Sequence, residues 1–480
     1  MEEIDIALIK KRSLAGVVAL TSRTFFLQLL AFGATFLLTI FLTPAIFGIF
    51  YVVSAIISFL GYFSDIGLAA ALIQKKEPLT HDDLATTFTI QQILVAILVI
   101  FSLIFSDKIA SFYRLDTSGV WLLRALIVSF FLSSLKTIPS VLLERKLAFQ
   151  LLIIPQILET VCFYTVAVVL AWRGYGITSF SWAVLTRGII GLIAMYVISP
   201  WRMSFGISRS VTKKLLHFGI PFQFNSLLAL IKDDLLTVFL GKVLPFAQVG
   251  YIGWAKKWAE VPLRLFMDSV IRVTFPAFSR IQKEKELLAH AIEKTLFGLS
   301  LTIFPVSVGL LFFVRPLVYL VPRYIKWEPA LFSFSLFVLG SSIASLSTPL
   351  TNALNAVGKI KVTLFLMVLW TVATWVLTVL LISYIGFDGV ALALLLITTT
   401  IFLVIALVKR IAPFSFFGSI RGSLIAALAQ TIWYFLLVGR APYGYLRLVS
   451  VGVSGICIYG LLVWVFERQK IRSLISDFRS

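Results

Sequence analysis

Charged residues are scarce in this chain of 480 residues: Asp, Glu, Lys and Arg make up only 13% of it, whereas hydrophobic residues make up 60%. A soluble protein carries about twice that share of charged residues. The composition therefore excludes soluble enzymes and soluble binding domains. It indicates a protein that holds most of its length in a lipid bilayer.

Cysteine and histidine are also rare, with two residues of the first kind and three of the second. Cys162 and Cys457 lie far apart in apolar stretches, and the histidines His81, His217 and His290 are scattered near the ends of such stretches. Neither set has the spacing of a metal site or of a disulfide framework. We therefore expect no metal site, no cofactor and no disulfide.

Long apolar runs recur from one end of the chain to the other, each long enough to cross a hydrocarbon core of about 30 Å. They predict an all-α polytopic membrane protein with fourteen transmembrane helices. The predicted limits are 14–42, 46–73, 84–106, 120–143, 150–172, 177–199, 215–240, 248–279, 296–321, 329–357, 362–385, 388–408, 416–439 and 444–466. The first run is too long for the core of a cleavable signal peptide, so we expect it to remain as a membrane anchor.

The Lys and Arg residues outside these runs predict the orientation of the helices. Most of them fall in alternate segments, beginning with Lys10, Lys11 and Arg12, and such segments face the cytoplasm. We therefore expect a multi-pass protein of the inner (cytoplasmic) membrane with both termini cytoplasmic. Basic residues spread over short loops meet anionic phospholipid, and they do not form the single basic face that a nucleic-acid-binding protein presents.

An internal repeat predicts two lobes. The sequence Leu37-Leu38-Thr39-Ile40-Phe41-Leu42 at the end of span 1 recurs as Leu235-Leu236-Thr237-Val238-Phe239-Leu240 at the end of span 7, and a turn with Pro and Gly follows each copy. Two such units with six spans each would share one orientation, with a substrate site between them. The expected domains are an N-terminal lobe (1–199), a cytoplasmic linker (200–214), a C-terminal lobe (215–410) and a segment with two additional spans and a cytoplasmic tail (411–480).

Fifteen charged residues lie inside the first eight predicted spans. A charge at the bilayer centre costs about 2.5–3.5 kcal/mol, so such residues face water, a ligand or one another. The basic ones are Arg23, Arg124, Lys136, Arg187, Lys232, Lys256, Lys257, Arg264 and Arg272; the acidic ones are Asp65, Glu159, Asp233, Asp234, Glu260 and Asp268. The basic excess favours an anionic cargo, and the guanidinium fork of Arg suits phosphate.

Span 8 has the most regular of these patterns, with Lys256, Glu260, Arg264, Asp268 and Arg272 at successive intervals of four residues. Side chains four residues apart are neighbours on a helix, so the five form one stripe of alternating charge. The stripe would line a hydrated cavity or, alternatively, would be the solvated face of an interfacial helix.

Other charges inside the spans leave two interpretations open. Asp233 and Asp234 beside Lys232 would balance basic residues across a cavity, or would bind a coupling Na⁺ or H⁺ together with Asp268 and Asp65. Asp65 could equally cap a helix.

Arg23 would contact substrate or extend toward the cytoplasmic face. Arg187 lies near the middle of span 6, and we expect Glu159 to pair with it or with Arg124. The predicted cavity residues are Arg23, Arg187, Lys232, Lys256, Lys257, Arg264 and Arg272.

Several segments together resemble the polysaccharide transporter, or Wzx-type oligosaccharide flippase, family, which belongs to a superfamily with the MATE drug exporters and the lipid II flippases. They are 42–48, 64–74, 139–149, 250–255, 275–280 and 352–359, including Ser64-Asp65-Ile66-Gly67 and Phe275-Pro276-Ala277-Phe278. The resemblance implies two six-helix lobes around a cavity that opens alternately to either side. It also implies a polyprenyl-diphosphate-linked oligosaccharide as cargo, export of a surface polysaccharide, and polysaccharide assembly machinery as a partner.

Two other function classes compete with a flippase. A MATE-like, cation-coupled exporter of small organic cations should carry an acidic excess in its cavity, whereas the excess here is basic. A membrane-embedded glycan-processing enzyme should offer a catalytic His or carboxylate in a sizeable loop, and the predicted outward loops are short. We therefore expect a transporter and not an enzyme.

Overall fold

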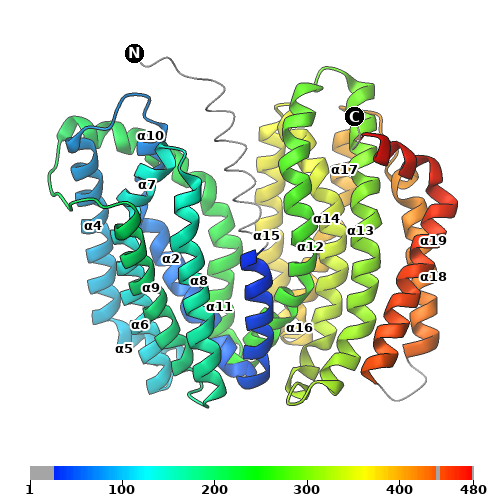
Figure 1. The fold of residues 1–480 in the computed structure, drawn as a ribbon, viewed down its shortest axis with the longest axis horizontal. Helices are drawn as coiled ribbons and strands as arrows, with labels where there is room; N and C mark the ends of the chain where they lie inside the picture. The colour runs from blue at the N-terminus through cyan, green and yellow to red at the C-terminus, as the bar shows by residue number, and fades with distance from the viewer. Residues whose placement is uncertain (1–25, 439–443, 478–480) are drawn as a thin grey trace. The chain divides into compact units, whose positions relative to one another are not determined.

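The computed structural model describes residues 26–438 and 444–477, which are almost entirely helical and contain no β-strand. Their contacts divide the chain into two compact units, residues 1–250 and 251–480 (Figure 1). The first unit contains the helix Phe26–Phe41, α2 (Pro44–Asp65), α3 (Leu68–Gln74), α4 (His81–Ile104), α5 (Ser106–Tyr113), α6 (Thr117–Leu135), α7 (Thr137–Arg145), α8 (Phe149–Trp172), α9 (Thr178–Ile198), α10 (Arg209–Leu230), the π-helical turn η1 (Ile231–Leu235) and α11 (Leu236–Val243).

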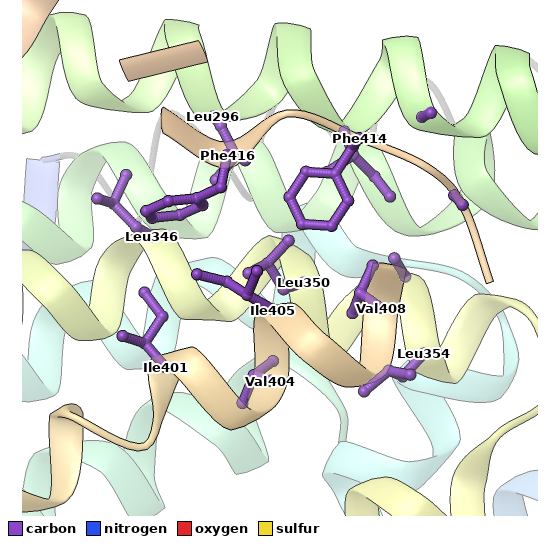
Figure 2. Packing of buried hydrophobic residues seen from close by; sticks show 14 of the residues in the cluster. Leu296, Leu346, Leu350, Leu354, Ile401, Val404, Ile405, Val408, Phe414 and Phe416 are labelled. Carbon is purple, nitrogen blue, oxygen red and sulfur yellow. The ribbon is translucent and has the colours of Figure 1, made fainter. Parts of the chain in front are cut away.

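The second unit begins within α12 (Phe246–Arg280). It continues with α13 (Lys285–Leu320), the 3₁₀ turn η2 (Ile325–Ala330), α14 (Leu331–Ala356), α15 (Ile360–Ile385), α16 (Asp388–Thr398), α17 (Ile401–Lys409), α18 (Phe416–Val438) and α19 (Tyr445–Asp477). Buried side chains from α13, α14, α17 and the start of α18 form its main hydrophobic core, in which Leu350 and Val404 are fully buried (Figure 2).

The described part of the chain has eleven helices that are long and apolar enough to cross a membrane. Thirteen of the fourteen predicted spans coincide with helical structure, and so does the second half of span 1, whose residues 14–25 lie outside the described part of the chain. The all-α, polytopic fold class is confirmed. The three spans outside the eleven are the short apolar helix Phe26–Phe41, the combination α10–α11 and the helix α12. The last two carry the charged residues of spans 7 and 8, which lower their apolar character.

Three predicted spans consist of two helices each, although their apolar runs are continuous. In span 2, α2 ends before Ile66 (φ 46°) and Gly67 (φ 72°), which both have left-handed backbone conformations, and α3 begins after them. At Gly67 a Cβ atom would lie 2.5 Å from the carbonyl oxygen of Gly219, so α3 and α10 approach to backbone contact there. Span 4 is interrupted at Lys136, between α6 and α7, and span 12 between α16 and α17.

A second close approach joins the start of α2 to the start of α12. A Cβ atom on Gly48 would lie 1.8 Å from the carbonyl oxygen of Phe246, and one on Gly250 would lie 1.9 Å from that of Pro44. The two contacts are reciprocal, because each glycine lies four residues after the carbonyl group that the other glycine approaches. Only glycine fits a backbone approach of this kind.

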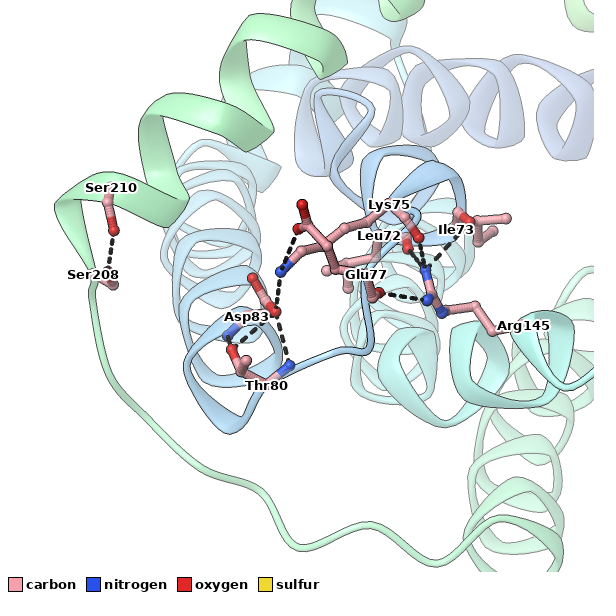
Figure 3. Close-up of polar contacts among 9 residues, drawn as sticks. All are labelled: Leu72, Ile73, Lys75, Glu77, Thr80, Asp83, Arg145, Ser208 and Ser210. Carbon is pink, nitrogen blue, oxygen red and sulfur yellow. Dashed lines mark hydrogen bonds and ion pairs between the residues drawn. The ribbon is translucent and has the colours of Figure 1, made fainter. Parts of the chain in front are cut away.

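Backbone carbonyls at the end of α3 are held by one arginine (Figure 3). The Arg145 guanidinium at the end of α7 donates to the carbonyl oxygens of Leu72 at 2.7 Å and Glu77 at 2.9 Å, and also to that of Lys75. The ammonium of Lys75 in turn lies 2.6 Å from the Asp83 carboxylate. These bonds satisfy the end of a short helix and fix the loop between spans 2 and 3.

The segment between α9 and α10 runs along the start of α4. The backbone amides of Gly206 and Ser208 donate to the hydroxyls of Thr89 and Thr86, each at 3.0 Å, and Trp201 packs edge-on against Phe88. This segment lies inside the first compact unit, whereas the predicted lobe boundary falls within it at 200–214. The division into lobes with a linker stays a prediction.

Candidate functional site

A buried carboxylate between two basic side chains forms the polar centre of the first unit. Glu159, in the middle of α8, has a side chain that is only 8% exposed. The Lys136 ammonium donates a short hydrogen bond to its Oε1 atom, and the Nε atom of Arg187 lies 3.7 Å from its Oε2 atom. The two cations and one carboxylate leave this cluster with one net positive charge.

The interruption of span 4 places Lys136 in this cluster. Its backbone lies between α6 and α7, and its side chain is 20% exposed. Gly191 on α9 supplies the space for the carboxylate, because a Cβ atom there would lie 2.2 Å from Glu159 Oε1. The ion pair is therefore fitted into the interface of α8 and α9.

The Arg187 side chain faces a cavity of about 300 Å³. It stands in the middle of α9 and is 54% exposed, and within the described residues its guanidinium makes no hydrogen bond to another side chain or carbonyl. The other lining residues come from the helix Phe26–Phe41 and from α8: Leu27, Gln28, Ala31, Thr160, Phe163 and Tyr164. An exposed guanidinium within a membrane-spanning helix is costly unless water or an anion meets it.

The pairing expected of Glu159 is confirmed for Arg187 and wrong for Arg124. Arg124 lies 2.9 Å from Asp107, on the short helix α5 that follows span 3. Lys136 was missed as a partner, since a continuous helix would have placed it near the end of span 4. The run Lys136-Thr137-Ile138-Pro139 is the local signal, because proline disfavours an uninterrupted helix.

The predicted stripe on span 8 lies on α12. Glu260 and Arg264 form an ion pair of 2.8 Å, and the Arg264 side chain is 66% exposed. Lys256 and Lys257 precede them on the same helix and are half-buried. The side chains of Asp268 and Arg272 lie outside the described residues, so the stripe as a whole stays a prediction.

The remaining predicted site residues lie in different settings. Lys232, Asp233 and Asp234 form the π-helical turn η1, where the Thr237 hydroxyl donates to the carbonyl oxygen of Asp233. The Asp65 carboxylate accepts the backbone amide of Ala69 at 3.2 Å, as a cap for α3.

Arg23 lies outside the described residues. Within those residues no group of three or more His, Cys, Asp and Glu side chains could hold a metal ion.

The family model for "Polysaccharide biosynthesis protein" matches residues 37–331, more than half of the chain. The chain belongs to this family. The matched segment includes Lys136, Glu159 and Arg187, and the family resemblance found in the sequence is confirmed.

Two curated relatives of this chain come from bacteria. The succinoglycan biosynthesis transport protein ExoT of Rhizobium meliloti is 23% identical over 92% of this chain and 90% of its own length. An uncharacterized membrane protein in the cps region of Klebsiella pneumoniae is 26% identical over 74% of this chain and 75% of its own length.

Among solved structures, the lipid II flippase MurJ in an inward closed conformation has a similar fold. It aligns with a TM-score of 0.75 at 16% identity, covering 94% of this chain and 99% of that one. At this identity the likeness supports the transporter fold of this polysaccharide biosynthesis protein and does not bear on its cargo.

Proposed function

We propose that this protein is a flippase that moves polyprenyl-diphosphate-linked oligosaccharide from the cytoplasmic to the outer leaflet for export of a surface polysaccharide. The observation that carries the proposal is the half-exposed Arg187 guanidinium in a cavity within the membrane-spanning part of the first unit. A diphosphate is the anionic part of such a cargo, and the guanidinium fork can bind it through two hydrogen bonds. The family and the transport relative from Rhizobium meliloti support the same assignment.

In the proposed mechanism, the diphosphate and sugars cross in a hydrated path and the diphosphate contacts Arg187, while the lipid tail stays in the bilayer. The basic residues of α12 serve the same transport step. Both termini face the cytoplasm, as the distribution of Lys and Arg predicts. An interior-negative potential then favours outward movement of each negative charge by about 2.3 kcal/mol per 100 mV. Exchange of Na⁺ or H⁺ at Asp233 and Asp234 belongs to the same proposal.

The basic cavity argues against the competing exporter of organic cations, because Arg187 would repel such a cargo. The protein would act without catalysis of its own and would work beside the enzymes that assemble the polysaccharide. The transport step ends when the headgroup reaches the outer face, where those enzymes use it.

Replacing Arg187 with Ala should lower glycan export at least about tenfold, because a charge-assisted contact to phosphate contributes about 1.5–3 kcal/mol. Arg187→Lys should recover part of the export, since it keeps the charge and loses the fork. The measurement is the accumulation of lipid-linked glycan on the inner leaflet of cells that carry each variant. Arg173→Ala, at an exposed arginine beyond the end of α8, is the matched control.

Normal export by Arg187→Ala at equal protein level would refute the role of Arg187. Cells that lack the whole protein test the broader proposal separately. If they build no inner-leaflet pool of lipid-linked glycan, the flippase assignment itself is wrong.

Replacing Arg264 with Ala should abolish export and leave the folded protein almost as stable as before. The pair with Glu260 is exposed and spaced by four residues, so its loss costs only about 0.3–0.5 kcal/mol. Arg272→Ala should have the same effect on export. Export assays and thermal unfolding of the purified variants check this, with Arg280→Ala near the exposed end of α12 as the control.

A further inference from the structure

The second unit contains a polar cavity of about 260 Å³ that the proposed transport step does not use. It lies where α13 and α18 begin and α19 nears its end, three helices that pack against one another (Figure 1). The lining residues are His290, Glu293, Lys294, Phe297, Ser415, Gly418, Ser419 and Lys470. Charges of both signs therefore face a single small space.

The cavity is held open by interactions between the three helices. The Glu293 Oε1 atom accepts the backbone amide of Ser415 at 2.6 Å, which leaves its second carboxylate oxygen for another donor. The Lys470 ammonium donates to the Gly418 carbonyl oxygen at 2.8 Å and lies 2.9 Å from the buried Glu467 carboxylate. The wall of the cavity is thus fixed from α13, α18 and α19 together.

The surrounding surface places this cavity at the level of lipid headgroups. Away from the cavity, apolar side chains of α18 and α19 such as Leu428 and Leu461 are exposed, as expected of helices that face lipid. Six residues before Lys470 on α19, the exposed Trp464 ring lies 4.9 Å from the Arg468 guanidinium. Tryptophan beside a basic residue is typical of the boundary between hydrocarbon and headgroups.

We propose that this cavity binds the headgroup of a phospholipid that carries both a phosphate and a primary ammonium, such as phosphatidylethanolamine. Lys294 lies on the lining with His290 and suits the phosphate, whereas the charge of Lys470 is balanced by Glu467. The Glu293 carboxylate accepts a charge-assisted hydrogen bond from the ammonium. An exclusively anionic headgroup would leave Glu293 opposed to a like charge, and a trimethylated one would offer it no N–H donor.

The inference does not depend on the proposed cargo, since it concerns a different cavity and a resident lipid. The same headgroup chemistry is also present in free phosphoethanolamine, which has no acyl chains. A lipid should bind far more tightly than the free headgroup, because its chains contact the exposed apolar faces of α18 and α19.

The test is a titration of the purified full-length protein in detergent with short-chain phosphatidylethanolamine, phosphatidylcholine and phosphatidylglycerol, and with free phosphoethanolamine. We expect phosphatidylethanolamine to bind about tenfold more tightly than the other two lipids. Glu293→Gln keeps an acceptor for the Ser415 amide and should reduce this preference to about twofold or less. Glu286→Gln, an exposed acid in the first turn of α13, should keep the preference intact.

Lys294→Gln distinguishes the contribution of the phosphate to binding from that of the ammonium. It should lower the affinity for all three phospholipids equally, because all three carry the phosphate. Equal affinities for the three lipids in the parent protein would overturn the proposal. So would an unchanged preference in Glu293→Gln. Free phosphoethanolamine that binds as tightly as the lipid would assign the cavity to a soluble ligand and overturn the assignment to a membrane lipid.

Discussion

Gly250→Val should prevent the protein from accumulating in folded form. A Cβ atom at this position would lie 1.9 Å from the carbonyl oxygen of Pro44, which is backbone and cannot rotate away as a side chain would. Overpacking by a few methyl groups typically costs about 1–3 kcal/mol, and a clash with backbone at a helix crossing should cost more. Gly48→Val should behave in the same way, since its Cβ atom would meet the carbonyl oxygen of Phe246 at 1.8 Å.

Two glycines inside α13 provide the control for this prediction. Beyond the backbone of their own helix turn, no described atom lies within 4 Å of the place that a Cβ atom would take at Gly298 or Gly309. Gly→Ala there should therefore leave stability equal or raise it by up to about 1 kcal/mol. The measurement is the fraction of detergent-solubilised protein that elutes as a single folded species before and after heating. This fraction should be low for the Val variants of Gly250 and Gly48 and normal for the Ala variants of Gly298 and Gly309. A Gly250→Val variant that matches Gly298→Ala in this assay would contradict the close crossing of α2 and α12.

Removal of Glu159 from its buried pair with Lys136 should cost about 3–5 kcal/mol, because it leaves an uncompensated charge in the protein interior. Removal of Lys136 should cost less, because Glu159 keeps Arg187 as a partner. Glu159→Leu is the more severe of the two, since it leaves both Lys136 and Arg187 without their shared carboxylate. The double variant Lys136→Met, Glu159→Leu should recover most of the lost stability, because a well-packed apolar pair often replaces a buried ion pair without loss.

The measurement is a double-mutant cycle on the purified protein, with thermal unfolding of the parent, both single variants and the double variant. Losses that simply add in the double variant would show that the two side chains do not interact. Arg124→Ala serves for comparison, because its ion pair with Asp107 is exposed and should contribute less than about 1 kcal/mol.

Hydrophobic runs predicted the spans well because length and apolar character are properties of whole segments. Wherever the structure describes the predicted spans they coincide with helices, even in α12, whose charges remove it from the clearly apolar set. The interruptions at Ile66 and Lys136 were not predicted. Each depends on one or two backbone angles that neighbouring helices stabilise, and the apolar runs do not encode these angles. Pro139 is the local signal for the break at Lys136.

The contrast between whole-segment properties and local backbone angles also explains how much of the candidate site could be predicted from the sequence. An isolated Glu159 within span 5 was enough to expect a basic partner, Arg187 or Arg124, and the structure places the Arg187 Nε atom 3.7 Å from its carboxylate. The stronger partner, Lys136, could not be predicted, because its position depends on the interruption of span 4. Gly191 was likewise missed, since only the packed structure shows that it leaves room for the carboxylate.

The two most polar spans, α10–α11 and α12, are consecutive in the chain, and this affects how the protein is inserted during synthesis. Each Asp, Lys or Arg near the middle of a helix adds about 2.5–3.5 kcal/mol to the cost of entering the bilayer. Because the two spans are consecutive and would cross in opposite directions, the six spans after them keep their orientation whether this pair enters early or late. By then α2 and α3 have already been made, and they are the helices against which α11 and α10 pack. Packing against earlier helices, more than hydropathy, would therefore stabilise this pair of spans in the membrane.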